Sequence, residues 1–196
     1  MKKTSLILFI LLITFNAEIF AKTSVPIKRI AEGRSDAKIT IIAFESLTCS
    51  HCADFHINIY PKLKKEFIDT GLVKIEFRNF PLDMAALNAS IISQCANDGN
   101  SQMLHFLFLN QKKWAIGQTA EDANKNLKQL LKSKNPSLDF EKCTNNKVLE
   151  EYVLNDRIEG VKKFKVNATP TIIINNKKFE KSLNYKNIKK IIEKLI

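Results

Sequence analysis

The sequence carries two cysteines, Cys49 and Cys52, separated only by Ser50 and His51. Residues three apart lie about one helical turn from each other, so two sulfurs at this spacing can close a disulfide with little backbone movement. At the start of a helix, unpaired backbone N–H groups would favour the thiolate of Cys49 over the thiol. A protonated His51 would add a positive charge beside the same sulfur. The spacing therefore predicts thiol–disulfide exchange carried by Cys49, Cys52 and His51.

The pKa of Cys49 decides in which direction such a pair works. Each unit by which this pKa falls below the ambient pH favours the reduced pair by about 1.4 kcal/mol, which raises the potential of a two-electron couple by about 30 mV. A strongly depressed pKa thus predicts a disulfide that passes readily to another protein. The alternatives for a lone pair are a metal site and a structural loop, but zinc needs a second pair or two histidines. We therefore expect no metal and no cofactor.

The cysteine pair lies between a predicted strand and a predicted helix. Residues 39–44 form a short apolar, β-branched run that is typical of a buried strand. After the cysteines, large apolar residues recur at every fourth position and share one helix stripe, namely Phe55, Ile59, Leu63 and Phe67. Pro61 lies within this stripe and is expected to kink the helix. Residues 73–77 alternate as a half-buried strand, which completes a βαβ unit.

The remainder of the chain is predicted to be helical and then to return to the sheet. Apolar residues recur at helical spacing from Leu82 to about Lys165. Residues 171–174 predict a strand, Asn175 and Asn176 a hairpin turn, and the C-terminal residues an amphipathic helix. We expect an α/β sheet domain formed by residues 22–81 and 166–196, split by a helical insertion at residues 82–165.

The N-terminus has the profile of an export signal. Lys2 and Lys3 precede an apolar core of about 10 residues, which is short of the ~20 needed to span a bilayer. We expect a signal peptide over residues 1–21, cleaved after Ala21, with an uncleaved anchor as the alternative. The mature chain should then reside in the periplasm, an oxidising compartment in which disulfides persist.

The composition restricts the functional classes. A chain of 196 residues with 45% hydrophobic and 26% charged residues suits a globular protein and argues against disorder. The net charge of +11 invites a nucleic-acid function. Only four of the basic residues are Arg, and the lysines are scattered without a stripe, so we expect no nucleic-acid partner. Four cysteines are too few for a fold held together mainly by disulfides.

Two motifs make the sequence resemble the DsbA family of periplasmic thiol oxidoreductases. The first is the segment from Phe44 to His56, which includes Cys-Ser-His-Cys, and the second is Ala-Thr-Pro-Thr at residues 168–171, before a strand. The resemblance covers the chain from about residue 25 onward and implies a thioredoxin-like fold with a helical insertion domain. It implies that Cys49 is the exposed nucleophile and Cys52 the buried resolving thiol. Thr169 and Pro170 would form a cis peptide that binds an extended substrate segment.

Two departures from the family pattern concern the surroundings of the cysteines. Ser50 stands where oxidase members often carry Pro, which puts the redox potential in doubt. Ala43 stands where many relatives have an acidic residue, and Glu45 lies two positions later on the same strand face. We expect Glu45 to be a solvated charge at the rim; a buried proton acceptor for Cys52 is the alternative.

The remaining cysteines and histidines receive structural interpretations. Cys95 and Cys143 are an even pair in an exported protein, so we expect a structural disulfide, with a buried free thiol at Cys95 as the alternative. His56 is expected on a helix surface and His105 to be partly buried. Neither has neighbours that suggest a metal.

The sequence thus predicts an exported thiol:disulfide oxidoreductase that introduces disulfides into secreted proteins with free thiols. By analogy with the family, a quinone-linked membrane protein would reoxidise it. A disulfide isomerase or reductase is the nearest alternative, although isomerases of this type usually add an N-terminal oligomerisation domain and only residues 22–38 precede the first strand. A chaperone or binding module without turnover is a third interpretation, against which the intact cysteine pair argues.

Overall fold

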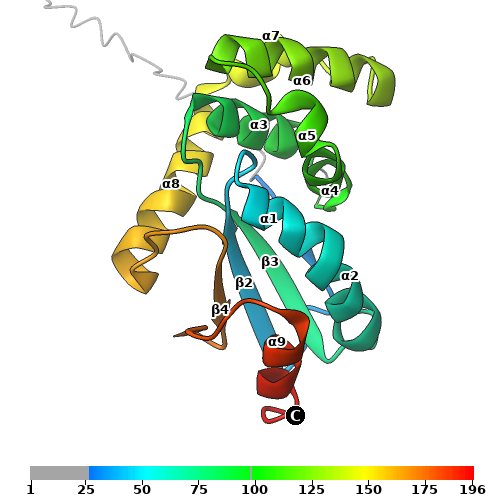
Figure 1. Ribbon diagram of the computed structural model, residues 1–196, viewed down its shortest axis with the longest axis vertical. Helices are drawn as coiled ribbons and strands as arrows, with labels where there is room; N and C mark the ends of the chain where they lie inside the picture. The colour runs from blue at the N-terminus through cyan, green and yellow to red at the C-terminus, as the bar shows by residue number, and fades with distance from the viewer. Residues whose placement is uncertain (1–26, 98) are drawn as a thin grey trace, which may run out of the picture.

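The computed structural model describes residues 27–97 and 99–196, so the predicted signal peptide lies outside the described residues. Within them the strands form one sheet in the order β1–β3–β2–β4–β5, with β2 and β3 parallel and the other neighbours antiparallel (Figure 1). The strands are β1 (Ala31–Glu32), β2 (Ile39–Glu45), β3 (Val73–Asn79), β4 (Thr171–Ile174) and β5 (Lys177–Lys178). The strands predicted from hydrophobic patterning are therefore confirmed.

A helical run follows β2 and packs on one face of the sheet. It comprises α1 (Ser50–Asp54), η1 (Phe55–Ile59), α2 (Tyr60–Leu63) and η2 (Lys64–Ile68). The four residues of the predicted apolar stripe are all buried in the main core. Pro61 lies between the two η segments, which have wide π-type turns. Proline has no N–H for the carbonyl four residues earlier, and wide turns are a common way for a helix to continue past such a gap.

The segment between β3 and β4 is helical, as predicted. Its helices are α3 (Met84–Cys95), α4 (Gln102–Leu109), α5 (Gln111–Trp114), α6 (Ala120–Lys134), α7 (Phe140–Thr144) and α8 (Lys147–Phe164). Helices α3 to α7 gather beyond the end of the sheet where β2 and β3 finish (Figure 1). Trp114 is fully buried there, and its indole N–H donates to the Leu107 carbonyl at 2.9 Å. The domain boundaries at residues 82 and 165 stay a prediction.

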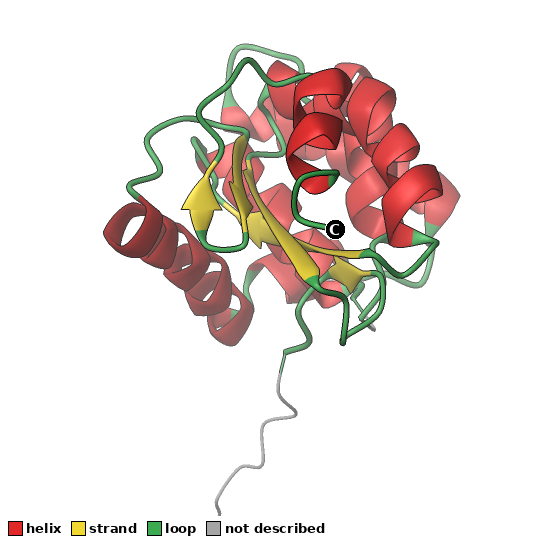
Figure 2. Cartoon of the chain, turned by 90° about the horizontal axis from the view of Figure 1, so that it is seen from below, coloured by secondary structure: helices red, strands yellow, loops and turns green. Residues whose placement is uncertain are grey.

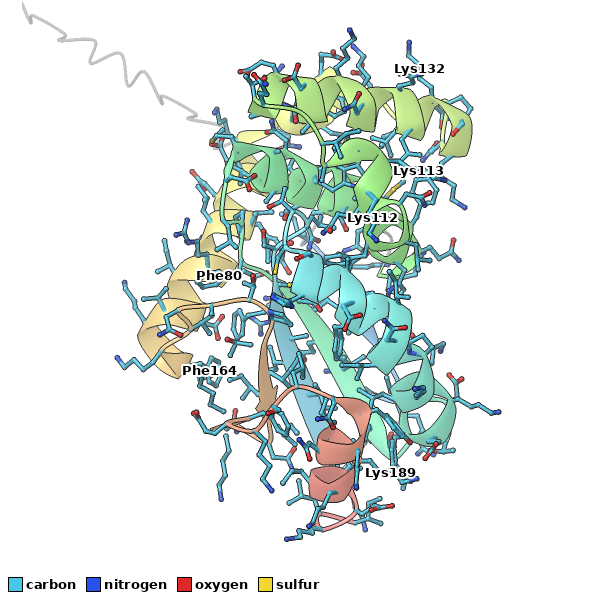
Figure 3. The ribbon with its side chains drawn as sticks, viewed as in Figure 1. Phe80, Lys112, Lys113, Lys132, Phe164 and Lys189 are labelled. Carbon is cyan, nitrogen blue, oxygen red and sulfur yellow. A yellow bond between two sulfur atoms is a disulfide. The ribbon has the colours of Figure 1, made fainter. Side chains whose placement is uncertain are left out.

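Helix α8 lies on the opposite face of the sheet from α1 and α2 (Figures 1 and 2). Phe80 and Phe164 form a small apolar cluster there with Phe44 of β2 (Figure 3). Gly160 permits this close approach, because a Cβ at that position would lie 2.9 Å from the Phe44 ring. The sheet is therefore covered on both faces.

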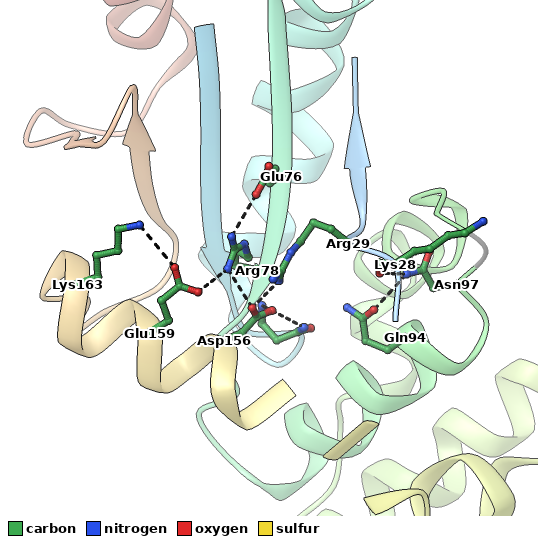
Figure 4. A network of polar contacts seen from close by, with 10 residues as sticks. Lys28, Arg29, Glu76, Arg78, Gln94, Asn97, Asp156, Glu159 and Lys163 are labelled. Carbon is green, nitrogen blue, oxygen red and sulfur yellow. Dashed lines mark hydrogen bonds and ion pairs between the residues drawn. The ribbon is translucent and has the colours of Figure 1, made fainter. Parts of the chain in front are cut away.

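A buried carboxylate joins α8 to the sheet (Figure 4). Asp156 accepts hydrogen bonds from the Asn79 backbone N–H at 3.0 Å, from the Asn79 amide at 2.9 Å and from Arg78 at 3.2 Å. Arg29 also pairs with it. Such a charge is tolerated at 3% side-chain exposure because its oxygens are paired and hydrogen-bonded.

The chain ends with a hairpin and a helix. Asn175 and Asn176 have φ values of 45° and 65°, as a tight turn between antiparallel strands requires, and they link β4 to β5. Helix α9 (Tyr185–Ile192) then packs beside α2. In the part of the chain that the structure describes, no helix combines the length and apolar character needed to cross a bilayer.

Candidate active site

Cys49 and Cys52 lie where β2 gives way to α1. Cys49 is the N-cap residue of α1, with extended backbone angles, and its carbonyl accepts the N–H groups of Cys52 at 3.1 Å and Ala53 at 3.2 Å. Both cysteines are free thiols; Cys49 is partly buried and Cys52 is fully buried. The predicted position at a helix start is therefore the observed one. His51, between them, is exposed.

The two thiols have opposite acid–base character. A hydrogen bond from the Cys52 side chain, assisted by Thr169 and by the backbone N–H groups of Cys52 and His51, lowers the pKa of Cys49 to about 5. Burial acts against this effect but does not outweigh it. Burial raises the pKa of Cys52 far above its usual value, and the hydrogen bond that its thiol donates to Cys49 adds to that effect. At neutral pH, Cys49 is a thiolate and Cys52 a thiol, as thiol exchange at an outer sulfur requires.

Sheet register brings Thr169 and Pro170 to the cysteines. Strand β4 is antiparallel to β2 with Thr171 paired to Phe44, so the residues just before β4 lie beside the loop that follows β2. The Thr169–Pro170 peptide bond is cis. Cys49 Sγ lies 3.3 Å from the Thr169 carbonyl oxygen, across 120 residues of sequence, and donates to it when Cys49 is protonated.

Gln111 of α5 holds the active-site loop from the helical segment. Its amide nitrogen donates to the Leu47 carbonyl at 2.8 Å and to the Cys49 carbonyl at 3.0 Å. Thr48, between these two residues, donates to Asp83 at 2.7 Å. Sequence reasoning missed Gln111, because no spacing in the sequence relates it to the cysteine pair.

The expectation that Glu45 is a solvated rim charge is wrong. Glu45 is only 4% exposed, since His56 of η1 contacts it and Leu104 and Phe108 of α4 line the small cavity beside it. The expectation that His56 lies on a helix surface is also wrong, since His56 is 2% exposed and its Nε2 lies 3.0 Å from both Glu45 oxygens. The sequence did contain a signal for His56, because its position four residues after the buried Cys52 places it on the same helix face.

The two further cysteines form a disulfide between α3 and α7. The sulfurs of Cys95 and Cys143 are 2.06 Å apart. His105 is partly buried, as expected. Among residues 27–97 and 99–196, no group of three or more His, Cys, Asp or Glu side chains is placed to hold a metal ion.

Comparison with known proteins gives consistent matches along the chain. The family model described as thioredoxin matches residues 26–194. The chain is 30% identical over 175 residues to the disulfide bond formation protein D of Bacillus subtilis, covering 83% of this chain and 74% of that protein. A protein of Rickettsia bellii is 32% identical over 145 residues, or 73% of this chain. The chain spans only 52% to 60% of the length of three such Rickettsia relatives.

Solved structures agree with these sequence matches. The crystal structure of Wolbachia pipientis α-DsbA1 superposes with a TM-score of 0.75 and 28% identity, covering 85% of this chain and 90% of that one. Oxidised BdbD from Bacillus subtilis gives a TM-score of 0.70 and 28% identity over 85% and 92% of the two chains. Since sequence and structure matches both extend over most of the chain, the protein belongs to the thioredoxin family, as one of its DsbA-like members.

Proposed function

We propose that this chain is an exported protein-disulfide oxidoreductase that introduces disulfide bonds into secreted proteins. The observation that carries the proposal is the asymmetry of the cysteine pair. Cys49 is partly accessible at a helix N-terminus with a pKa of about 5, whereas Cys52 is buried with a strongly raised pKa. A stable Cys49 thiolate stabilises the reduced enzyme and so makes the Cys49–Cys52 disulfide an oxidant.

Each half of the exchange follows from this asymmetry. A substrate thiolate attacks Cys49 Sγ, the Cys49–Cys52 bond breaks, and Cys52 leaves as a thiolate that takes up a proton. The second substrate thiolate then attacks the substrate sulfur of the mixed disulfide and releases Cys49 as a thiolate. The substrate loses two electrons and the cysteine pair gains them. Next to the attacked sulfur, the Thr169 backbone is the surface against which an extended substrate segment would pair.

The proposed location is the periplasm, after removal of residues 1–21. The proposed partners are secreted proteins with free thiols and a quinone-linked membrane protein that reoxidises Cys49 and Cys52. The DsbA-like relatives support this setting. N-terminal sequencing of the exported protein tests it, and a mature chain that starts at Lys22 is the expected result.

An equilibrium measurement separates an oxidase from an isomerase or reductase. The protein is equilibrated in glutathione buffers of graded ratio, quenched in acid and resolved by mass. We expect a potential well above the value of about −270 mV that thioredoxin shows. A potential near that value would contradict the oxidase assignment and favour a reductase.

A single substitution distinguishes the proposed oxidoreductase from a chaperone or binding module without turnover. Cys49→Ala removes the attacking sulfur but leaves the surrounding surface in place. We expect this variant to lose oxidation of a reduced peptide dithiol completely. If it still supported refolding of a reduced, disulfide-containing substrate at the wild-type rate, the protein would act as a binding module.

A further inference from the structure

Four titratable side chains form an unbroken line of hydrogen bonds that starts at Glu45, the last residue of β2 and four residues before Cys49. Glu45 lies within 3.0 Å of His56 Nε2. The other nitrogen of His56, Nδ1, lies 2.8 Å from Nδ1 of His105. The Nε2 atom of His105 lies 2.8 Å from Glu32 Oε1. These residues come from β2, η1, α4 and β1, so the line crosses the molecule through four elements that only the tertiary fold assembles.

The line runs from a sealed end to an accessible end. The Glu45 and His56 side chains are 3% and 0% exposed, whereas those of His105 and Glu32 are 18% and 15% exposed. Glu32 is also 3.2 Å from Lys64, whose side chain is 41% exposed. A carboxyl group as buried as Glu45 cannot exchange its proton directly with water, but Glu32 can.

Aromatic rings enclose the two histidines and fix their orientation. The Phe108 ring stacks on His56 with centroids 4.0 Å apart. The Tyr60 ring stacks on His105 at 4.4 Å, and Phe77 meets His105 edge-on at 5.3 Å. Packing of this kind keeps each ring nitrogen directed at its partner.

The protonation states are consistent with one complete arrangement. Burial raises the pKa of Glu45 well above its usual value and so favours its carboxylic acid form, and burial lowers the pKa of His56 to about 3, which leaves that ring neutral at pH 7. Burial opposes ionisation of Glu32, but hydrogen bonds from His105, Ser101 and Tyr60 outweigh it and hold its pKa far below the usual range. Three protons then fill three hydrogen bonds, from Glu45 to His56, His56 to His105 and His105 to Glu32.

We propose that Glu45, His56, His105 and Glu32 form a proton relay that connects the buried side of the cysteine pair to the surface. Transfer of each proton across its own hydrogen bond moves one proton from Glu45 to Glu32. It interchanges the tautomers of both histidines and leaves both rings neutral. This inference rests on the proposed function, because it assigns the path of the proton that exchange at Cys52 requires.

The relay sets whether Glu45 acts as an acid or as a base. With the proton on Glu45, the carboxylic acid can protonate Cys52 when the disulfide opens and Cys52 leaves as a thiolate. With the proton on Glu32, the Glu45 carboxylate can accept the Cys52 proton when that sulfur attacks a mixed disulfide at Cys49. In that step the Cys49–Cys52 bond forms, the Cys49–partner bond breaks, and the partner sulfur leaves with the electron pair.

Other charged groups act on the two ends of the relay. At the inner end, burial raises the pKa of Glu45, and the negative charge of the Cys49 thiolate adds to that effect. At the outer end, Glu32 accepts the Tyr60 hydroxyl at 2.6 Å and the Ser101 hydroxyl, beside Lys64. Lys64 is itself paired with Asp69 at 2.6 Å. The cationic Lys64 therefore favours the arrangement in which Glu32 is ionised and Glu45 holds the proton.

Single-turnover reduction tests the relay. The oxidised protein is mixed with excess dithiothreitol, quenched in acid and resolved by mass, in H2O and in D2O, from pH 5 to pH 9. His105→Gln offers an acceptor to His56 and a donor to Glu32, but an amide cannot pass a proton. Glu32→Gln keeps an acceptor for His105 but cannot take up the proton. We expect both variants to react on the order of tenfold to a hundredfold more slowly, with an altered solvent isotope effect.

A packing control and a spectroscopic measurement complete the test. Leu127→Ala opens a cavity on α6, which packs chiefly against α3 and α5, so we expect lower thermal stability but the wild-type isotope effect. In the wild type, ¹⁵N NMR of the histidine rings should show coupled tautomers: protonated Nδ1 on His56 with protonated Nε2 on His105, or the reverse on both.

Two outcomes would overturn the relay. One is a wild-type rate and isotope effect in both His105→Gln and Glu32→Gln, and the other is a pair of histidine tautomers that do not match. Neither readout needs a protein substrate. A wild-type chain that fails to oxidise peptide dithiols but shows the relay behaviour with dithiothreitol would therefore refute the proposed function and leave the relay standing.

Discussion

The Thr169 hydroxyl is buried without a hydrogen-bond partner among the described residues, while the thiol of Cys49 lies 3.3 Å from the carbonyl oxygen of the same threonine. A buried hydroxyl without a partner is unfavourable. Ionisation of Cys49 supplies a strong acceptor for that hydroxyl. The Thr169 hydroxyl therefore stabilises the thiolate more than the thiol and lowers the pKa of Cys49.

Thr169→Val should raise the pKa of Cys49 above its value of about 5, because the hydroxyl is among the groups that lower it. The rate of alkylation by iodoacetamide against pH measures this pKa directly. Cys52→Ala should raise it further, since the hydrogen bond from Cys52 is the largest cause of the lowering. Thr171→Val is the matched control, because that hydroxyl donates to the Ala168 carbonyl. An unchanged midpoint in Thr169→Val would show that the hydroxyl does not reach the thiolate.

Gln111→Ala should lower the free energy of unfolding by about 1–3 kcal/mol, because it removes the donor to the Leu47 carbonyl and one of the donors to the Cys49 carbonyl. The loop before Cys49 should also become more mobile, which hydrogen exchange of the Cys49 and Cys52 amides would detect. Lys112→Ala, the exposed neighbour on α5 (Figure 3), provides the control and should change stability little. Equal urea midpoints for the two variants would contradict the role of Gln111.

Glu45→Gln should stabilise the reduced protein increasingly as the pH rises. The folded state holds Glu45 protonated because burial raises its pKa, whereas the unfolded chain ionises it near pH 4.3, its usual value. The wild type therefore loses stability as the pH rises from that value through the raised pKa, and glutamine does not. Urea unfolding at pH 4 and pH 8 measures the difference. Glu151→Gln, at an exposed position, is the control for replacing a glutamate by glutamine. If Glu45→Gln changed the free energy of unfolding equally at pH 4 and pH 8, the expected pH dependence would be refuted.

Removal of the Cys95–Cys143 disulfide should lower stability without changing the reactive pair. The two cysteines are 48 residues apart, and loss of a loop of that length lowers the free energy of unfolding by about 4 kcal/mol in the chain-entropy model. Calorimetry of the double variant Cys95→Ala/Cys143→Ala measures this loss. The pH midpoint of Cys49 alkylation should stay unchanged, because the disulfide joins α3 to α7 and not the helix that carries Cys49. A double variant as stable as the wild type would show that the bond adds nothing to the fold.

Local patterning predicted the frame of the molecule correctly. Strand β2 appears in the sequence as a run of apolar, β-branched residues, and the buried stripe of the following helix appears as apolar residues at every fourth position. The spacing of Cys49 and Cys52 indicated the start of that helix. The environment of Glu45 could not be predicted in this way. Charged residues are almost never fully buried unless paired, and the partner of Glu45 lies on another element. His105 is 49 residues from His56 and 73 residues from Glu32, so only long-range packing brings the four side chains into line.

The pairing of β4 with β2 has a consequence for the order in which the site is completed. Cys49 and Thr169 are 120 residues apart, so most of the chain emerges between the two halves of the site. During synthesis and export, both reactive cysteines would be exposed long before the Thr169–Pro170 loop can pack against them. Full thiol reactivity is therefore a property of the finished chain, and a truncated product that lacks β4 would carry the motif without the loop that faces Cys49.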